Sequence, residues 1–346
     1  MQGNKKEAQG LNQAFFEKLE NQAKSDPKRI AFPESDNEMI IRAAREVIDR
    51  GIGIPVLIGV QGQVENLAAS AGVSTDGFRY YDNTDEALIN KLADDYVSRF
   101  EGMKQSAVIR RAADALNCAM YLAKLGLVDC VAAGRMYTTA DVIISAQRII
   151  GMKEGVSLVS SIGVVDAPGF SGSEGSMLCV ADCAITPFPD SGDLADIAIS
   201  SADTVETILG WEPRIAMLAF STCGSSEHDS IDTIHEAIRL VRERRPNLKI
   251  DGEFQLDTAL LPETAKSKVK RDSDVAGKAN IIIFPNLHAG NIGVKLIQIF
   301  GKADAYGPVL QGFAIPVCDF SRSAPLSEMI GNILMLVVRA QRENKD

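Results

Sequence analysis

Four short segments place glycine, hydroxyl, amide or arginine side chains directly after apolar runs of the chain. They are residues 134–141, 220–226, 284–291 and 319–322. Hydroxyl groups and free backbone N–H groups at the start of a helix suit a phosphate or pyrophosphate. None of the segments is a Walker loop or a G-x-G-x-x-G fingerprint, and each one alone is typical of a turn or a helix cap. Their positions after apolar runs make them candidates for ligand binding at the carboxyl ends of parallel strands.

Metal-binding side chains are sparse by comparison. The three histidines, His228, His235 and His288, show no H-x-x-x-H spacing, so the sequence predicts no metal site. The six cysteines are scattered and form no C-x-x-C pair, which is typical of reduced structural thiols. The first ten residues contain no apolar signal core. These features predict a cytoplasmic protein.

The charge and hydropathy of the chain argue against two classes of binding partner, nucleic acids and membranes. Lysine and arginine total 36 against 46 acidic residues, for a net charge of −10. A large nucleic-acid footprint needs a dense basic surface, so we expect no nucleic-acid partner. The longest apolar runs, such as residues 281–285, are too short to cross a bilayer, and we expect no membrane partner either.

Strand and helix patterns alternate along both halves of the chain. After an amphipathic helix at 11–24, apolar strands are predicted at 29–33, 54–59, 128–133, 214–220 and 280–284. Helices are predicted at 38–49, with Ser35 or Asp36 as its cap, at 109–125, from 139 onward, at 232–244 and at 326–342. Strongly apolar strands between helices are typical of parallel sheets covered on both faces.

The fold class predicted is therefore α/β. At 346 residues the chain is long for one core, and the pattern is interrupted near residues 151–155. We expect two three-layer α/β domains with mainly parallel sheets. The first comprises residues 1–154 plus 311–346, and the second comprises residues 155–310.

The four segments, with the motifs between them, resemble the phosphate acetyltransferase (phosphotransacetylase) family over essentially the whole chain. Motifs that carry the resemblance are FPE at 32–34, TTAD at 138–141, FSTCGS at 220–225, DGEFQLD at 251–257, AGKAN at 276–280, FPNL at 284–287, GNI at 290–292, YGP at 306–308, QG at 311–312 and DFSR at 319–322. The resemblance implies a homodimer with the active site in the cleft between two domains. It implies reversible acetyl transfer between coenzyme A and phosphate by direct thiolate attack. CoA and acetyl-CoA are then substrates, and no cofactor is permanently bound.

The resemblance also implies roles for individual residues. Ser321 matches a serine that hydrogen-bonds at the reacting centre, and Arg322 matches the arginine beside it that steadies charge. Glu328 occupies the position of the family's aspartate base, seven residues after the serine, with one more methylene. Arg99 matches an arginine that contacts CoA, although a solvated helix residue is an equal alternative. The remaining predicted substrate-binding residues lie in the motif loops: Arg135, Thr138, Thr139, Ser221, Thr222, Gly224, Ser225, Asn286, Gly290 and Asn291.

Several positions depart from the family pattern. A lysine expected at 223 is Cys223, and an arginine that binds phosphate, expected three residues after Asp141, is Ile144. Arg135, at the end of a predicted strand, or Arg148, one helical turn beyond Ile144, would restore the lost charge, and we favour Arg135. Two alternatives stay open: a transferase for propionyl or butyryl groups, and a CoA-binding relative with impaired catalysis.

Overall fold

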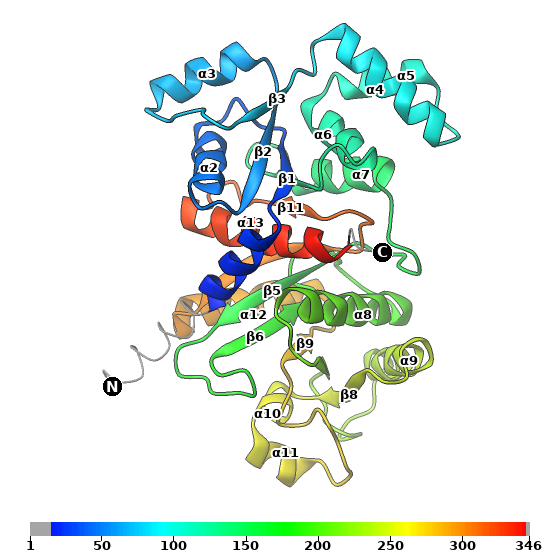
Figure 1. The fold of residues 1–346 in the computed structure, drawn as a ribbon. Coiled ribbons are helices and arrows are strands. Elements are labelled where there is room, and N and C mark those ends of the chain that lie inside the picture. Colours follow the sequence, from blue (N-terminus) through cyan, green and yellow to red (C-terminus); the bar gives the residue numbers. More distant parts are fainter. Residues whose placement is uncertain (1–14, 344–346) are drawn as a thin grey trace. The chain divides into compact units, whose positions relative to one another are not determined.

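The computed structural model describes residues 15–343, and the chain divides into two compact units (Figure 1). The first unit comprises Phe16–Glu154 and the chain from Phe313 onward. The second unit comprises Gly155–Gly312 together with Phe15. Of the helix predicted at 11–24, residues 11–14 lie outside the described residues, and residues 15–25 are helical.

The first unit is built on five parallel strands in the order β3-β2-β1-β4-β11. Their bounds are β1 Lys28–Phe32, β2 Gly53–Ile58, β3 Arg79–Tyr81, β4 Cys130–Ala133 and β11 Val317–Asp319. β1 and β4 are buried towards their carboxyl ends, as expected of strands with helices on both faces. The last strand, β11, comes from the far end of the chain and pairs with β4.

Helices cover this sheet in two groups. α2 (Glu38–Asp49) packs against α13 (Leu326–Glu343) and against α3 (Gln61–Ser70). α6 (Ala115–Lys124) packs against α7 (Thr139–Ile149), α5 (Gln105–Ala112) and α4 (Glu86–Arg99). α13 and α6 both contact β1 and β4, and the two groups are separate in the figure (Figure 1).

Two local predictions in this unit are wrong. The helix predicted at 109–125 is two helices, α5 and α6, because Asp114 caps a new start by accepting a hydrogen bond from the N–H of Asn117. The cap of α2 is Asn37, whose side chain accepts from Met39 N, rather than Ser35 or Asp36. Ser35 instead donates its hydroxyl to Ile58 O at 2.6 Å and ties β1 to β2.

The second unit has a mixed sheet in the order β10-β5-β6-β9-β7-β8. β5 pairs antiparallel with both β10 and β6, and the other pairs are parallel. The strand bounds are β5 Ser160–Asp166, β6 Met177–Ala181, β7 Arg214–Leu218, β8 Lys249–Phe254, β9 Ile281–Ile283 and β10 Asp304–Gln311. The helix bounds are α8 Ser191–Ile208, α9 Asp229–Arg244, α10 Leu256–Leu260, α11 Pro262–Lys268 and α12 Leu287–Gly301.

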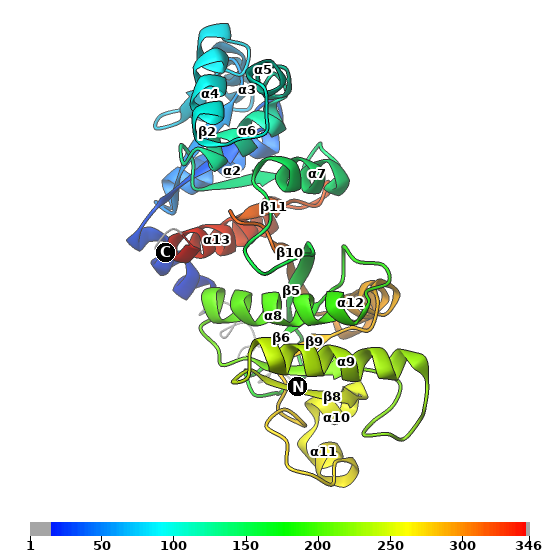
Figure 2. The same cartoon turned by 90° about the vertical axis from the view of Figure 1, so that its right-hand side faces the viewer.

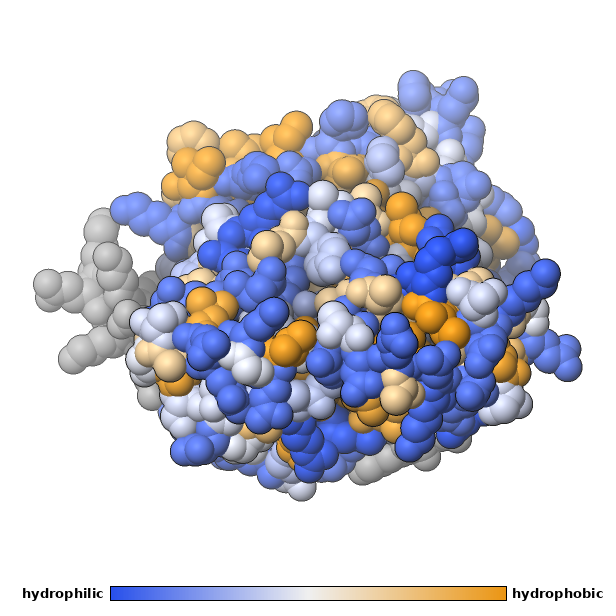
Figure 3. Space-filling model, turned by 90° about the horizontal axis from the view of Figure 1, so that it is seen from above, coloured by the Kyte–Doolittle hydropathy of each residue, from blue (hydrophilic) through white to orange (hydrophobic). Residues whose placement is uncertain are grey.

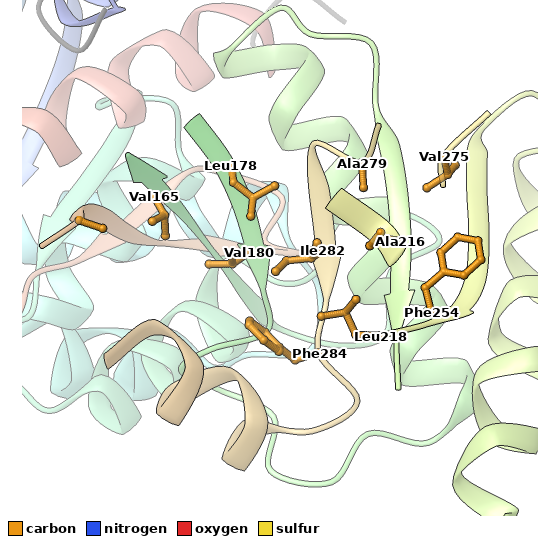
Figure 4. Close-up of a cluster of buried hydrophobic side chains, with 12 residues drawn as sticks. Val165, Leu178, Val180, Ala216, Leu218, Phe254, Val275, Ala279, Ile282 and Phe284 are labelled. Carbon is orange, nitrogen blue, oxygen red and sulfur yellow. The ribbon is translucent and has the colours of Figure 1, made fainter. Parts of the chain in front are cut away.

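One hydrophobic cluster of the second unit lies on one face of this sheet (Figure 4). Val180, Ile282 and Phe254 are at most 1% exposed and pack with nine other buried side chains. Val294 and Ile297 of α12 pack against the same cluster. α8 and α9 lie side by side, and α8 contacts β5, β6, β9 and β10 (Figure 2). The two units together confirm the α/β fold class.

Polar residues dominate the face of the molecule shown in Figure 3, with hydrophobic residues in smaller groups between them. Among the described residues, no helix combines the length and the apolar character needed to span a membrane.

Candidate active site

Three loops of the first unit emerge at one edge of its sheet. β1, β4 and β11 are neighbouring parallel strands, with Ile30 opposite Cys130 and Asp319 opposite Ala133. The segments that follow their carboxyl ends therefore lie together, at the edge where parallel α/β sheets bind ligands. These segments are residues 33–36, 134–138 and 320–325.

The buried carboxylate of Glu34 fixes the loop after β4. Glu34 is 2% exposed and accepts hydrogen bonds from three successive backbone N–H groups. The distances from the nitrogens of Arg135, Met136 and Tyr137 are 3.0, 2.5 and 2.9 Å. Such charge-assisted bonds are stronger than bonds between neutral groups, so the loop is held in one conformation. The sequence analysis missed this role of Glu34, although the residue lies in the FPE motif.

The same loop carries Arg135 to the turn at 321–324. Its guanidinium donates to the carbonyl oxygens of Ser321 at 3.4 Å and Ala324 at 3.3 Å. The turn itself closes with a bond from Ala324 N to Ser321 O at 3.0 Å. The structure thus brings together Arg135 and Ser321, which are far apart in the sequence.

Ser321 and Arg322 are exposed on this turn. The Ser321 hydroxyl lies 3.4 Å from the hydroxyl of Ser323, so it is available to a ligand. The positive charge of Arg322 favours the ionised forms of Asp319 and Asp141. It is therefore one of the contributions that lower the pKa of each carboxyl group. A hydroxyl donor and a guanidinium side by side suit an oxygen that carries or develops negative charge.

Asp319 lies beneath this turn and is 5% exposed. One carboxyl oxygen accepts the Thr139 hydroxyl at 2.6 Å, and the other, Oδ1, has no partner among the described residues. Burial, reinforced by the nearby charge of Glu34, raises the pKa of Asp319 to about 6, although Thr139 and Arg322 act in the opposite direction. A methyl group on Gly134 would meet Oδ1 at 2.1 Å, so only glycine fits there.

Glu328 lies in the first turn of α13 and is half-buried. Burial raises the pKa of its carboxyl group. A carboxylate with a raised pKa is a better proton acceptor than an ordinary glutamate, as general-base catalysis requires.

The start of α7 is defined by a capping box. The Thr138 hydroxyl accepts from Asp141 N at 3.1 Å, and the Asp141 carboxylate accepts in return from Thr138 N at 3.0 Å. Thr139 follows and binds Asp319, so α7 is anchored to the turn after β11. Ile144 is 50% exposed, and Arg148 is also exposed.

Arg99 lies apart from the residues around Ser321 at the carboxyl edge of the sheet. It lies at the end of α4, where it pairs with Asp95 at 2.8 Å and donates to Leu125 O at 3.3 Å. Leu125 precedes β4, so this position is at the amino edge of the sheet, opposite to the edge that holds Ser321. Contact of Arg99 with CoA stays a prediction.

The predicted residues of the second unit follow β7 and β9. In the loop at 221–225, the buried Glu253 carboxylate accepts from the Ser221 hydroxyl at 2.7 Å and from Gly224 N at 2.9 Å. Thr222 is buried, its hydroxyl accepting from Gln255 N, while Ser225 is exposed. Much of the hydrogen-bonding capacity of this loop is therefore used within the unit.

The loop after β9 is similar. Asn286 caps α12 by accepting from Ala289 N at 3.0 Å. Gly290 lies against the backbone of Asp182, where an added methyl group would meet the carbonyl oxygen at 2.2 Å. Asn291 is exposed and donates to Cys183 O at 3.3 Å. In residues 15–343, no group of three or more His, Cys, Asp or Glu side chains is placed to hold a metal ion.

Known proteins match the chain over nearly its full length. The family model described as phosphate acetyl/butaryl transferase matches residues 14–337. A phosphate acetyltransferase from Acetivibrio thermocellus is 36% identical over 330 residues, covering 95% of this chain and 98% of that protein. One from Bacillus subtilis is 35% identical over 328 residues, covering 94% and 98%. The crystal structure of a phosphotransacetylase from Streptococcus pyogenes has 32% identity and a TM-score of 0.88, covering 95% of this chain and 98% of that one.

The raised pKa of Asp319 has a measurable consequence for stability. A carboxyl group whose pKa is higher in the folded state stabilises the fold at low pH, and this contribution is lost as the pH rises through about 6. Between pH 4 and pH 7, the free energy of unfolding of the wild type should fall by on the order of 2 kcal/mol relative to Asp319→Asn. Urea unfolding of both proteins at several pH values measures this difference.

Asp141→Asn is the matched control. Asp141 is exposed, and its bonds from Thr138 lower its pKa, so its contribution is lost only at acid pH. Its difference from the wild type should stay constant between pH 5 and pH 7. A constant difference for Asp319→Asn over the same range would contradict the prediction.

Proposed function

Since this chain belongs to the phosphate acetyl/butaryl transferase family, we infer that it is a phosphate acetyltransferase. It moves an acetyl group reversibly between coenzyme A and inorganic phosphate. The observation that supports this most strongly is the cluster of Ser321, Arg322 and Arg135 at the carboxyl edge of the first sheet, within a chain that matches acetyltransferases end to end. The curated relatives named above are acetyltransferases, so we favour the acetyl group over propionyl or butyryl.

In the proposed reaction, the thiolate of CoA attacks the carbonyl carbon of acetyl phosphate. A bond forms between the sulfur and the carbonyl carbon. The bond between that carbon and the oxygen bridging to phosphorus breaks, and phosphate leaves with the electron pair of this bond. A free thiol has a pKa of about 8.5, so it is mostly protonated at neutral pH and needs a base. We assign that base to Glu328, whose half-buried carboxylate has a raised pKa.

Negative charge develops on the carbonyl oxygen and on the departing phosphate. We propose that the Ser321 hydroxyl donates to the carbonyl oxygen and that the Arg322 guanidinium meets the phosphate. Both side chains are exposed on one turn, ready to contact a ligand. Donors placed in advance where charge develops lower the barrier more than flexible ones.

Phosphate needs a further cation because Ile144 is apolar. We propose Arg135 for this role. It is half-buried at the carboxyl edge, and its two bonds to backbone carbonyls hold it beside Ser321. Arg148 is exposed in α7, nine residues beyond Thr139. The first turn of α7, which begins after Thr138, adds backbone N–H groups near the same site.

We propose that two loops of the second unit also contact substrate. Ser225 and Asn291 are exposed and are the members most able to reach a ligand. Ser221, Thr222 and Gly224 position the first loop through Glu253 and Gln255. Asn286 and Gly290 position the second loop through the cap of α12 and its close approach to Asp182.

We further propose that the protein is cytoplasmic and forms a homodimer through α12. Four apolar side chains at i, i+4, i+7 and i+8 are exposed on this helix: Ile292 at 55%, Leu296 at 50%, Ile299 at 69% and Phe300 at 79%. Monomeric proteins rarely expose such a row, and a two-fold axis would pack it against its own copy.

A coupled assay with acetyl phosphate and CoA tests the main proposal, and Arg322→Ala tests the site. The variant should lose at least about 2 kcal/mol of transition-state stabilisation, or roughly 30-fold in kcat/KM, because a charge-stabilising donor is gone. Arg42→Ala, which removes a half-buried arginine of α2 that pairs with Glu38, is the control and should retain full activity. Near-normal kcat and KM in Arg322→Ala would remove this residue from the mechanism.

Glu328→Gln preserves the shape of the side chain and removes its basicity. We expect kcat at neutral pH to fall by more than about tenfold, since general-base catalysis usually contributes at least that much. Glu38→Gln changes another glutamate in the first turn of a helix and should leave kcat unchanged. If the two variants have the same kcat as each other, the role of Glu328 is limited to its favourable interaction with the dipole of α13.

Arg135→Ala should raise the KM for acetyl phosphate and phosphate far more than the KM for CoA. The physical reason is the loss of a guanidinium that pairs with a dianion. Arg148→Ala is the comparison and should leave the phosphate KM unchanged. Arg135→Lys should restore part of the affinity by returning the charge. If both alanine variants keep a normal phosphate KM, neither arginine replaces the missing one.

Light scattering at micromolar concentration should give the mass of a dimer. Leu296→Glu places a charge in the apolar row and should shift the protein to monomer, because an unpaired charge is costly to bury. Leu127→Glu, at an isolated leucine that is 47% exposed, should remain dimeric. A monomeric wild type would refute the proposed assembly.

A further inference from the structure

The first unit contains a cavity of about 410 Å³ that the proposed mechanism does not use. It opens at the carboxyl ends of β1 and β2 and beside the start of α3. Apolar side chains form much of its lining, among them Ile58, Val64, Leu67 and Met136. Its volume is within the range of pockets that bind small organic ligands.

The charge of the lining excludes a phosphate group as the occupant. Glu34 and Asp36 both line the cavity, and its lining residues include no lysine, arginine or histidine. The Glu34 carboxylate is already satisfied by three backbone N–H groups, so its charge is not free for a cationic ligand. An uncharged, largely apolar group with a few polar atoms fits this lining.

Polar groups are nevertheless available at the cavity. The amide of Asn83 donates to Ala113 O at 2.7 Å, which leaves its own carbonyl oxygen open to a donor. The Gln63 amide is exposed and bonds to no other side chain in the described part of the chain. The Asn83 carbonyl oxygen can accept a hydrogen bond, and the Gln63 amide can both donate and accept one. These groups match the edge of a heteroaromatic base that carries an amino group.

One loop connects this cavity to the proposed reaction site. Met136 and Tyr137 line the cavity, whereas Arg135, directly before them, donates to Ser321 O. Glu34 holds all three residues through their N–H groups. A ligand whose reactive end lies at Ser321 therefore has a largely apolar pocket without cationic side chains close by for a distant part of the same molecule.

We propose that this cavity binds the adenine ring of the CoA substrate, an inference that rests on the proposed acetyltransferase function. Adenine is flat, uncharged and mostly apolar, and its amino group suits the acceptors of Asn83 and Gln63. The phosphates of CoA stay outside the cavity, whose lining includes no cationic side chain. The pantetheine arm then carries the thiol to Ser321.

The test compares two acyl acceptors, CoA and 4′-phosphopantetheine, which has the same thiol arm but no adenosine. Gln63→Trp places an indole at the cavity from an exposed position of α3, so the fold should be preserved. We expect the KM for CoA to rise by about tenfold or more, equivalent to roughly 1.4 kcal/mol, and the KM for phosphopantetheine to stay within about twofold. Asn66→Trp, on the same helix outside the cavity, should leave both values unchanged.

Equilibrium binding provides a readout independent of turnover. Adenosine 3′,5′-bisphosphate, titrated calorimetrically, should bind the wild type and Asn66→Trp and lose its affinity for Gln63→Trp. Equal increases in KM for both acceptors, or no increase for either, would overturn the adenine assignment. If the wild type acetylates neither acceptor, the acetyltransferase function fails, and the bisphosphate titration still decides whether the cavity binds adenine.

Discussion

The carboxylate of Glu34 is the interaction on which the first unit's site depends. It gathers the N–H groups of three consecutive residues, which would otherwise be unpaired in a loop at the end of a buried strand. Because the loop is fixed, Arg135 faces the turn after β11 and Met136 and Tyr137 face the cavity. Glu34 also adds negative charge near Asp319 and so helps to keep the pKa of that carboxyl group high. One buried charge thereby sets both the geometry and the electrostatics of this edge.

Much of the fold could be predicted from the sequence, because apolar strands and capped helices have local signals. The helix at 38–49 has the predicted bounds, and the strand at 29–33 is displaced by one residue. The break between α5 and α6 was missed because the apolar pattern runs through it and only the side chain of Asp114 marks the new start. Strands β5, β6 and β10 were not predicted, since antiparallel pairing within a mainly parallel sheet depends on contacts distant in sequence.

The site was predictable in part, for a different reason. Motif resemblance proposed Ser321, Arg322 and Glu328 as site residues, and strand-end reasoning proposed Arg135. Neither approach identifies Glu34 or Asp319, because their importance comes from burial and from partners about 100 and 180 residues away. For Arg99 the resemblance does not tell where the long side chain lies, and in this structure it pairs with Asp95.

The composition of the first unit from two distant segments has a consequence for biosynthesis. β11 and α13 are the last elements of the chain, yet β11 completes the sheet beside β4, and α13 packs on α2 and β1. While the ribosome is still translating the second unit, β4 has an unpaired edge and α2 an uncovered apolar face. Nascent chains in this state are prone to aggregate. The strands of the second unit, β5 to β10, all precede β11 in the chain, so this unit can finish folding before the first, and maturation then runs opposite to the usual amino-to-carboxyl order.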